Sequence, residues 1–245
     1  MTTIVGIKTN YGLDGIVLAA DFLVGDYTDD GKLVDKGFCR KLQHGDYWVM
    51  GSSGLYNTRA LNRFYGVLKG YKNYGSNEEK AKNIFREAIE KRRFMDVDTL
   101  NADLLTDDTL SEDTLEFILA IKEPNLNLWF VDHMGNLRPS PKDRDFDYLC
   151  AGSGSDSVIS YIEGKIRDGL ISADKINIPL AIELCRGSIA SAERSKDAGL
   201  GCDLVVLTKT SLDDHGPEIR KRLKEAENGV FAKISSSYEL AEKPQ

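Results

Sequence analysis

Residues 2–21 read TTIVGIKTNYGLDGIVLAAD, and this stretch decides the fold. Residues 2–8 are rich in β-branched side chains, and residues 16–20 form a second, continuous apolar run. The segment between these runs holds residues that favour turns: Asn10, Gly12, Asp14 and Gly15. The stretch therefore predicts two antiparallel strands joined by a turn, with a threonine at the second position of the chain.

Further along the chain, helices are expected in pairs between blocks of strands. Apolar residues at helical spacing predict helices at 61–68 and 81–88, and two more after Gly152, the second opened by Pro179. Further strands are expected at 38–43, 47–50, 117–121, 126–132, 148–150 and 203–208. Paired helices between hairpins indicate antiparallel sheets covered by helices, and they argue against a doubly wound parallel sheet.

The length of 245 residues, with 41% hydrophobic side chains, favours one domain over the whole chain. Residues 94–115 carry seven acidic side chains and no basic one, which indicates an insertion. Residues 217–245 are expected to form a short helix and a tail.

Charge and cysteine content exclude several classes of protein. The net charge of −7 and the lack of a basic cluster argue against nucleic acid as a partner. The cysteines Cys39, Cys150, Cys185 and Cys202 are widely spaced, which favours neither zinc nor disulfides and indicates the cytoplasm. The first residues resemble neither a signal peptide nor a membrane anchor. No cofactor and no metal is expected.

Thr2 offers chemistry of its own. If Met1 is removed, Thr2 presents a hydroxyl nucleophile together with an α-amine whose pKa lies near 7.7–8.0, so that one residue supplies both nucleophile and base. Threonine near an N-terminus is common, and an ordinary strand residue is the competing interpretation.

The sequence around Thr2 extends this pattern. TTIVGI at 2–7, LAAD at 18–21, RKL at 40–42, Gly51 and GSGS at 152–155 together resemble the proteasome β-subunit family of N-terminal-nucleophile hydrolases. The resemblance spans most of the chain and is weakest at 94–115. It implies an α+β fold, a four-layer αββα sandwich of two antiparallel sheets flanked by helix pairs, with the nucleophile at the end of the first strand.

The resemblance also implies roles for five residues. Thr2 is expected to be the nucleophile, Lys41 the cation beside it, and Asp21 the carboxylate that orients the lysine. Gly51 is expected to supply the oxyanion N–H, and Ser153 a hydroxyl for the Thr2 amine. Each has a plainer interpretation: Asp21 in a turn, Lys41 on a solvated strand, Ser153 capping a helix.

The choice of lysine and the substrate-binding positions rest on further observations. Lys41 is preferred over Lys36 because it is expected within a strand, with Cys39 and Gln43 on the same face. Positions near the specificity pocket of relatives are Val24, Gly25, Val49 and Ser53, which suggest an apolar subsite.

The chain also departs from the family. Leu23 stands where many members have arginine, and Gly25 where a substrate-contacting threonine is usual. Residues 194–200 match a family stretch, but Ser195 replaces its aspartate and Ala198 its serine. Asp197 and Ser195 therefore remain only auxiliary candidates.

Three functions stay open at this stage. The first is a threonine endopeptidase that cleaves polypeptides through an acyl-Thr2 ester. The second is a ring or scaffold subunit that has lost catalysis, and the third is an acyl transferase or peptide ligase. The resemblance implies a homo- or hetero-oligomeric ring, with an ATPase as a further partner.

Overall fold

The computed structural model describes residues 2–27, 33–38, 41–53, 116–122, 125–131, 137–141, 144–195 and 201–216, with the backbone alone at 23–27 and 33–38. The helices expected at 61–68 and 81–88, the acidic insertion at 94–115 and the tail at 217–245 lie outside these residues. The prediction of one domain over residues 1–245 is not tested.

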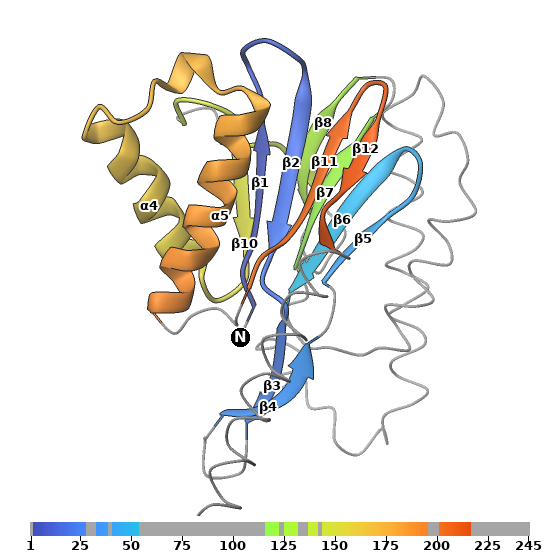
Figure 1. The fold of residues 1–245 in the computed structure, drawn as a ribbon, viewed down its shortest axis with the longest axis vertical. Coiled ribbons are helices and arrows are strands. Elements are labelled where there is room, and N and C mark those ends of the chain that lie inside the picture. The colour runs from blue at the N-terminus through green and yellow to red at the C-terminus, as the bar shows by residue number, and fades with distance from the viewer. Residues whose placement is uncertain are drawn as a thin grey trace, which may run out of the picture.

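The strands expected at 2–8 and 16–20 form the centre of a five-stranded antiparallel sheet (Figure 1). They are β1 (Ile4–Lys8) and β2 (Gly15–Ala20), and Ile4 lies opposite Ala20. The sheet order is β10-β1-β2-β11-β12. Its other strands are β10 (Tyr148–Ala151), β11 (Asp203–Thr208) and β12 (Leu212–Asp214).

A second antiparallel sheet has the order β5-β6-β7-β8-β9. Its strands are β5 (Leu42–His44), β6 (Trp48–Ser53), β7 (Glu116–Ile121), β8 (Asn127–Val131) and β9 (Leu137–Arg138). The hairpin expected around residues 44–46 is therefore confirmed. Its first strand begins later than expected, because Phe38 belongs to a different strand.

The two sheets pack face to face (Figure 1), and alternate residues of each strand fill the core between them. Ile4 and Leu18 of the first sheet are fully buried in one cluster with Val49 and Ile118 of the second. The other face of β1 and β2 carries Val5 and further apolar side chains, which form a separate cluster with the helices.

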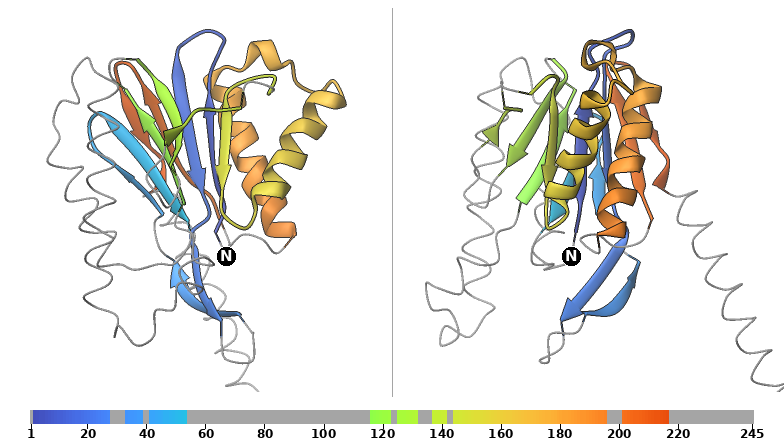
Figure 2. Two further views of the ribbon diagram at one scale, coloured as in Figure 1. Left: turned by 180° about the vertical axis from the view of Figure 1, so that it is seen from behind. Right: turned by 90° about the vertical axis from the view of Figure 1, so that its left-hand side faces the viewer.

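Two helices cover that outer face, as the views in Figure 2 show. They are α4 (Ser155–Arg167) and α5 (Ile178–Arg194), joined through the 3-10 turn η2 (Ala173–Lys175). Helix α5 begins where the sequence indicates, because the Asn177 side chain accepts a hydrogen bond from the Leu180 N–H and Pro179 occupies the first turn.

One strand pair was not expected. The polar stretch that follows Asp21 forms β3 (Leu23–Tyr27) and β4 (Leu33–Phe38), which pair with each other and with no other described strand. This ribbon projects beyond the sandwich at the end where the N-terminus lies (Figures 1 and 2). A bulge between Val24 and Gly25 shifts its register.

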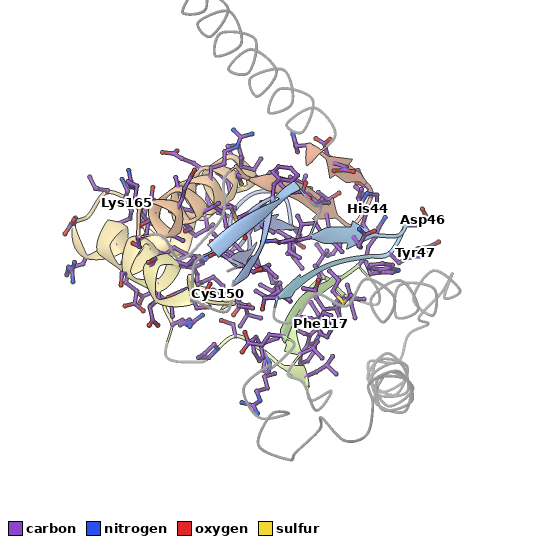
Figure 3. The ribbon with its side chains drawn as sticks, turned by 90° about the horizontal axis from the view of Figure 1, so that it is seen from below. His44, Asp46, Tyr47, Phe117, Cys150 and Lys165 are labelled. Atoms are coloured by element: carbon purple, nitrogen blue, oxygen red, sulfur yellow. The ribbon has the colours of Figure 1, made fainter. Side chains whose placement is uncertain are left out.

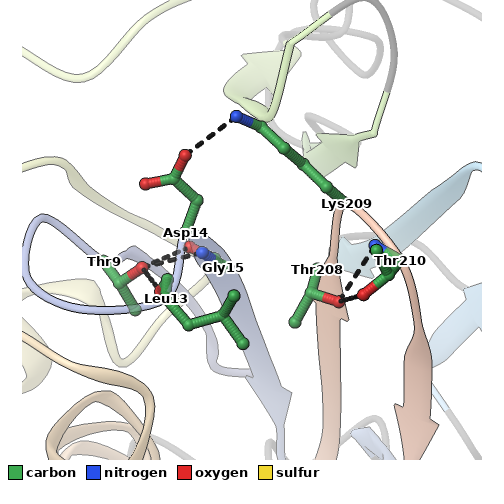
Figure 4. Close-up of polar contacts among 7 residues, drawn as sticks. All are labelled: Thr9, Leu13, Asp14, Gly15, Thr208, Lys209 and Thr210. Carbon is green, nitrogen blue, oxygen red and sulfur yellow. Dashed lines mark hydrogen bonds and ion pairs between the residues drawn. The ribbon is translucent and has the colours of Figure 1, made fainter.

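The opposite end of the first sheet is held by turns (Figure 4). Thr9 Oγ1 donates to Leu13 O and accepts from the Gly15 N–H at 2.7 Å, which closes the β1–β2 turn. Lys209 Nζ lies 2.9 Å from Asp14 Oδ2 and links this turn to the β11–β12 turn. Thr2 precedes β1 and Asp21 follows β2, so both residues lie at the end of the sheet away from this turn.

Candidate active site

The site begins where β1 and β2 lie side by side, just before β1 and just after β2. The Thr3 N–H donates to Asp21 Oδ1 at 2.7 Å, and the Asp21 N–H donates to Thr3 O at 3.2 Å. Asp21 is fully buried. Its carboxylate is therefore fixed one peptide unit from Thr2.

Lys41 approaches Asp21 from the other sheet. Its ammonium donates to Asp21 Oδ2 at 2.6 Å, and the two side chains are 2% and 0% exposed. Lys41 lies directly before β5, so the expectation that it sits within a strand is wrong by one residue. The plainer interpretation of Lys41 as a solvated residue is excluded by its burial.

The third part of the site is the turn between β10 and α4. The Thr2 N–H donates to Ser153 Oγ at 3.2 Å, and the Ser153 hydroxyl donates to Thr2 O at 3.3 Å. Helix α4 has Gly154 as its N-cap, with no capping bond from a side chain. Ser153 therefore contacts Thr2 instead of capping the helix.

Glycine is required at this turn. Gly152 has φ +90°, and a Cβ on it would lie 2.2 Å from Thr2 O. A Cβ on Gly154 would lie 2.0 Å from Thr3 Oγ1. The chain after β10 thus passes so close to residues 2 and 3 that no larger side chain fits there.

Glu116 is a member of this site that the sequence analysis did not single out. Its Oε2 accepts a hydrogen bond from the Gly152 N–H at 3.0 Å. It is the first residue of β7 and follows directly after the acidic stretch at 94–115, so no sequence pattern distinguishes it from the acidic residues before it.

Several predicted residues lie elsewhere or are tested only in part. Gly51 lies inside β6 against Ile4, whose Cγ2 would be 2.7 Å from an added Cβ, and its oxyanion role stays a prediction. Val49 is fully buried in the core between the sheets and is not brought to Thr2. Ser53, in contrast, ends β6 beside the turn: its Cβ would be 3.2 Å from a Cβ on Gly152.

The remaining candidates add nothing to the described site. Val24 and Gly25 lie in β3, whose side chains are outside the description. Ser195 is the C-cap of α5, where its hydroxyl donates to Ser191 O at 3.2 Å. Asp197 and Ala198 lie outside the described residues.

A partly buried thiol and a second, fully buried carboxylate lie near Asp21. Burial above all raises the pKa of Cys202 to about 12; the positive charge of Arg186 lowers it in part, and the negative charges of Asp203 and Asp21 add smaller increases to the same value. Asp203 is fully buried and lies opposite Ala20 in the β2–β11 pairing. This end of the sandwich, seen from below in Figure 3 with Cys150 marking β10 and Phe117 marking β7, is therefore rich in buried charge.

The described part of the chain holds no group of three or more His, Cys, Asp or Glu side chains arranged to bind a metal ion. Within the same residues, no helix combines the length and the apolar character that a membrane crossing requires.

Comparison with known proteins gives a fold but no close relative by sequence. No protein-family model matches the chain, and no curated protein matches it. Three similar solved structures are an Anbu mutant (Gly-1) from Hyphomicrobium sp. strain MC1, Anbu (ancestral beta-subunit) from Yersinia bercovieri, and eukaryotic HslV from Trypanosoma brucei.

Each is 17% identical to this chain, with TM-scores of 0.58, 0.58 and 0.54 in that order. The matches cover 95%, 99% and 84% of this chain and 97%, 97% and 99% of the other chains. The likeness confirms the expected fold, an αββα sandwich of two antiparallel sheets.

Proposed function

On the premise of this fold, we propose that the protein is a threonine peptidase of the proteasome β-subunit type, with Thr2 as nucleophile. One observation carries the proposal. The Thr2 nitrogen lies 3.2 Å from Ser153 Oγ, and the Thr3 N–H donates to the carboxylate of Asp21, which also binds the Lys41 ammonium. The proposed nucleophile, its hydroxyl partner and the two members of the buried ion pair thus come from four separate segments of the chain, which are linked through the backbone of Thr2 and Thr3.

The reaction requires that Met1 be removed, because only then is the Thr2 nitrogen an amine. Thr2 Oγ attacks the carbonyl carbon of a peptide bond while its proton passes to that amine. The tetrahedral intermediate collapses to an acyl ester on Oγ, and the leaving amine takes the proton. Water then attacks the ester carbon and gives up a proton to the Thr2 amine. The bond between the acyl carbon and Thr2 Oγ breaks, a carboxylic acid leaves, and the proton passes from the Thr2 amine to Oγ, which restores the hydroxyl.

The Asp21–Lys41 pair has an electrostatic role in this scheme. A buried cation close to Thr2 disfavours protonation of its amine and favours negative charge on its oxygen. The carboxylate of Asp21 compensates the lysine charge, which burial would otherwise make costly. Gly51 N–H is proposed as the oxyanion donor on the family resemblance alone.

The test is covalent labelling of Thr2. The natively expressed protein is incubated with a peptide epoxyketone, and the mass of the N-terminal fragment is measured. We expect Met1 to be absent and one adduct to form at residue 2, and Thr2→Ala to remain unlabelled. Full retention of Met1, or no adduct on protein that lacks it, would contradict the proposal.

A second candidate is a ring or scaffold subunit without catalysis. It is favoured by Ser195, which stands where relatives have an aspartate and whose hydroxyl bonds locally to Ser191 at the end of α5. Quantitative retention of Met1 in the labelling experiment would favour this role.

Oligomeric assembly and location form part of the proposal through the resemblance. We propose a cytoplasmic ring, homo- or hetero-oligomeric, that acts on polypeptides with an ATPase partner. Light scattering of the purified full chain measures the assembly, and a monomer at micromolar concentration would argue against a compartment of this kind.

A further inference from the structure

We propose that Glu116 is a positioning residue for this site: its carboxylate holds the turn that carries Ser153 against Thr2. The catalytic consequence rests on the proposed function, whereas the structural consequence does not. The inference follows from where Glu116 lies and from what it binds.

Glu116 ties one sheet to the other. It is the first residue of β7, paired with Ser53 of β6 in the second sheet. Its Oε2 accepts from the N–H of Gly152, which follows β10 of the first sheet, at 3.0 Å. The bond therefore crosses the sandwich at the same end as the Lys41–Asp21 ion pair.

Gly152 is the first residue beyond the β1–β10 pairing. The described register between these strands ends at Ile4 and Ala151, so the strand pairing does not continue to Gly152. Glu116 supplies an acceptor for this N–H from outside the sheet. Without it, the N–H that begins the turn would lose a charge-assisted bond.

The carbonyl of Gly152 is fixed as well. Its oxygen accepts from Ser155 Oγ at 2.7 Å and from the Ser155 N–H at 3.1 Å, which anchors the turn to the start of α4. The turn is thus held at both ends of one residue, by Glu116 at the nitrogen and by Ser155 at the oxygen.

This anchoring decides where Ser153 points. A Cβ added to Gly152 would meet both Thr2 O and the Cβ of Ser53, so Gly152 lies close to both residues. A small rotation of its peptide would move the Ser153 side chain that follows. Ser153 Oγ makes bonds of 3.2 and 3.3 Å to Thr2, and both are long enough to be lost by a modest displacement. Glu116 therefore acts on Thr2 through the turn and not by contact.

Two substitutions separate positioning from charge. Glu116→Ala removes the acceptor, whereas Glu116→Gln keeps an oxygen that can accept from the same N–H but removes the charge. Glu163→Gln serves as the matched control. Glu163 lies on α4, eight residues beyond Ser155 and so about 12 Å along the helix. Its carboxylate accepts a hydrogen bond from Tyr148 Oη of β10 at 3.2 Å.

Two readouts are measured on the full chain. The first is hydrogen exchange of the Gly152 amide, which does not depend on any activity. The second is the rate of epoxyketone labelling at Thr2, with kcat and KM for a peptide substrate per labelled site. Thermal unfolding of each variant shows that the comparison is made on folded protein.

We expect Glu116→Ala to raise Gly152 exchange at least tenfold and to lower kcat at least tenfold with KM nearly unchanged. Glu116→Gln should recover most of both, and Glu163→Gln should match the wild type. Unchanged Gly152 exchange in Glu116→Ala, or a Gln variant as impaired as the Ala variant, would overturn the inference. Wild-type protein that lacks Met1 but forms no adduct would overturn the proposed function alone, since amide exchange still tests the tether.

Discussion

The Lys41 ammonium lies 2.6 Å from Asp21 Oδ2, although Asp21 follows β2 of the first sheet and Lys41 precedes β5 of the second. Both side chains are almost completely buried. The other carboxylate oxygen of Asp21 binds the N–H of Thr3, so one carboxylate joins the second sheet to the segment that carries Thr2. The pair therefore contributes to the geometry of the site as well as to its charge.

Removing one charge of this pair should damage both stability and labelling. In Asp21→Asn the lysine remains buried without its counter-charge, which costs about 3–5 kcal/mol of unfolding free energy. Thr2 should then fail to react with the epoxyketone. Urea unfolding measures the first effect, and fragment mass measures the second.

The double variant Asp21→Asn/Lys41→Met is the control, because it removes both charges. It should regain much of the lost stability while Thr2 remains unreactive. If the double variant labels at the wild-type rate, the ion pair has only a structural role.

Ser153→Ala should separate reactivity from stability. Ser153 is exposed, and the group that alanine removes is its hydroxyl, which binds Thr2; the unfolding free energy should therefore change by no more than about 0.5 kcal/mol. The labelling rate at Thr2 should fall about tenfold, which corresponds to one neutral hydrogen bond near 1.4 kcal/mol.

Ser160→Ala is the matched control for this change, because Ser160 is exposed and lies on α4, the helix that follows the turn carrying Ser153. It should label at the wild-type rate. Equal labelling in both variants would remove Ser153 from the site.

The sequence predicts those parts of the molecule in which periodicity and apolar composition agree. β1, β2 and β11 are continuous apolar runs, and all three form where expected. Asp21 and Ser153 could be placed near Thr2 only through the family resemblance, because no spacing rule brings residues so far apart in the chain together.

Other features could not be predicted, for identifiable reasons. β3 (LVGDY) and β4 (LVDKGF) mix apolar residues with glycine and charged residues, so their sequences show neither a continuous apolar run nor strict alternation. Glu116 binds a backbone N–H 36 residues away, and a backbone partner leaves no trace in residue types. The resemblance places Val49 near the specificity pocket of relatives, and in this structure its side chain is fully buried in the core between the sheets.

Gly152→Ala should disrupt the site through a clash. The new Cβ would lie 2.2 Å from Thr2 O, and φ +90° is strained for any residue with a side chain. We expect a lower melting temperature and loss of labelling at Thr2. Gly12→Ala separates the two causes, because Gly12 has φ +77° but nothing lies within 4 Å of its added Cβ.

Gly12→Ala should therefore show a cost of about 1 kcal/mol from backbone strain, with labelling intact. If Gly152→Ala were no more harmful than Gly12→Ala, the close approach of the turn to Thr2 would be refuted.

The raised pKa values of the Cys202 and Cys185 thiols predict a loss of stability at alkaline pH. Burial raises the pKa of Cys202 to about 12 and that of Cys185 well above 9.0, whereas thiols in the unfolded chain ionise near 8.5. Below pH 8 both states keep these protons and stability is unaffected. Between pH 8.5 and 12 the unfolded state loses protons that the folded state retains, so the unfolding free energy falls as pH rises.

Urea midpoints at pH 7.5 and pH 9.5 measure this effect, with Cys202→Ala as the comparison. Alanine has no proton to lose, so its midpoint should fall less steeply over the same interval, while lysine and tyrosine titration affects both proteins equally. Iodoacetamide at pH 8 should likewise leave Cys202 and Cys185 unmodified in the folded protein, because the thiolate is the reactive form. Identical slopes for the two proteins, or rapid alkylation of Cys202, would mean that this thiol is not held protonated beside Asp21.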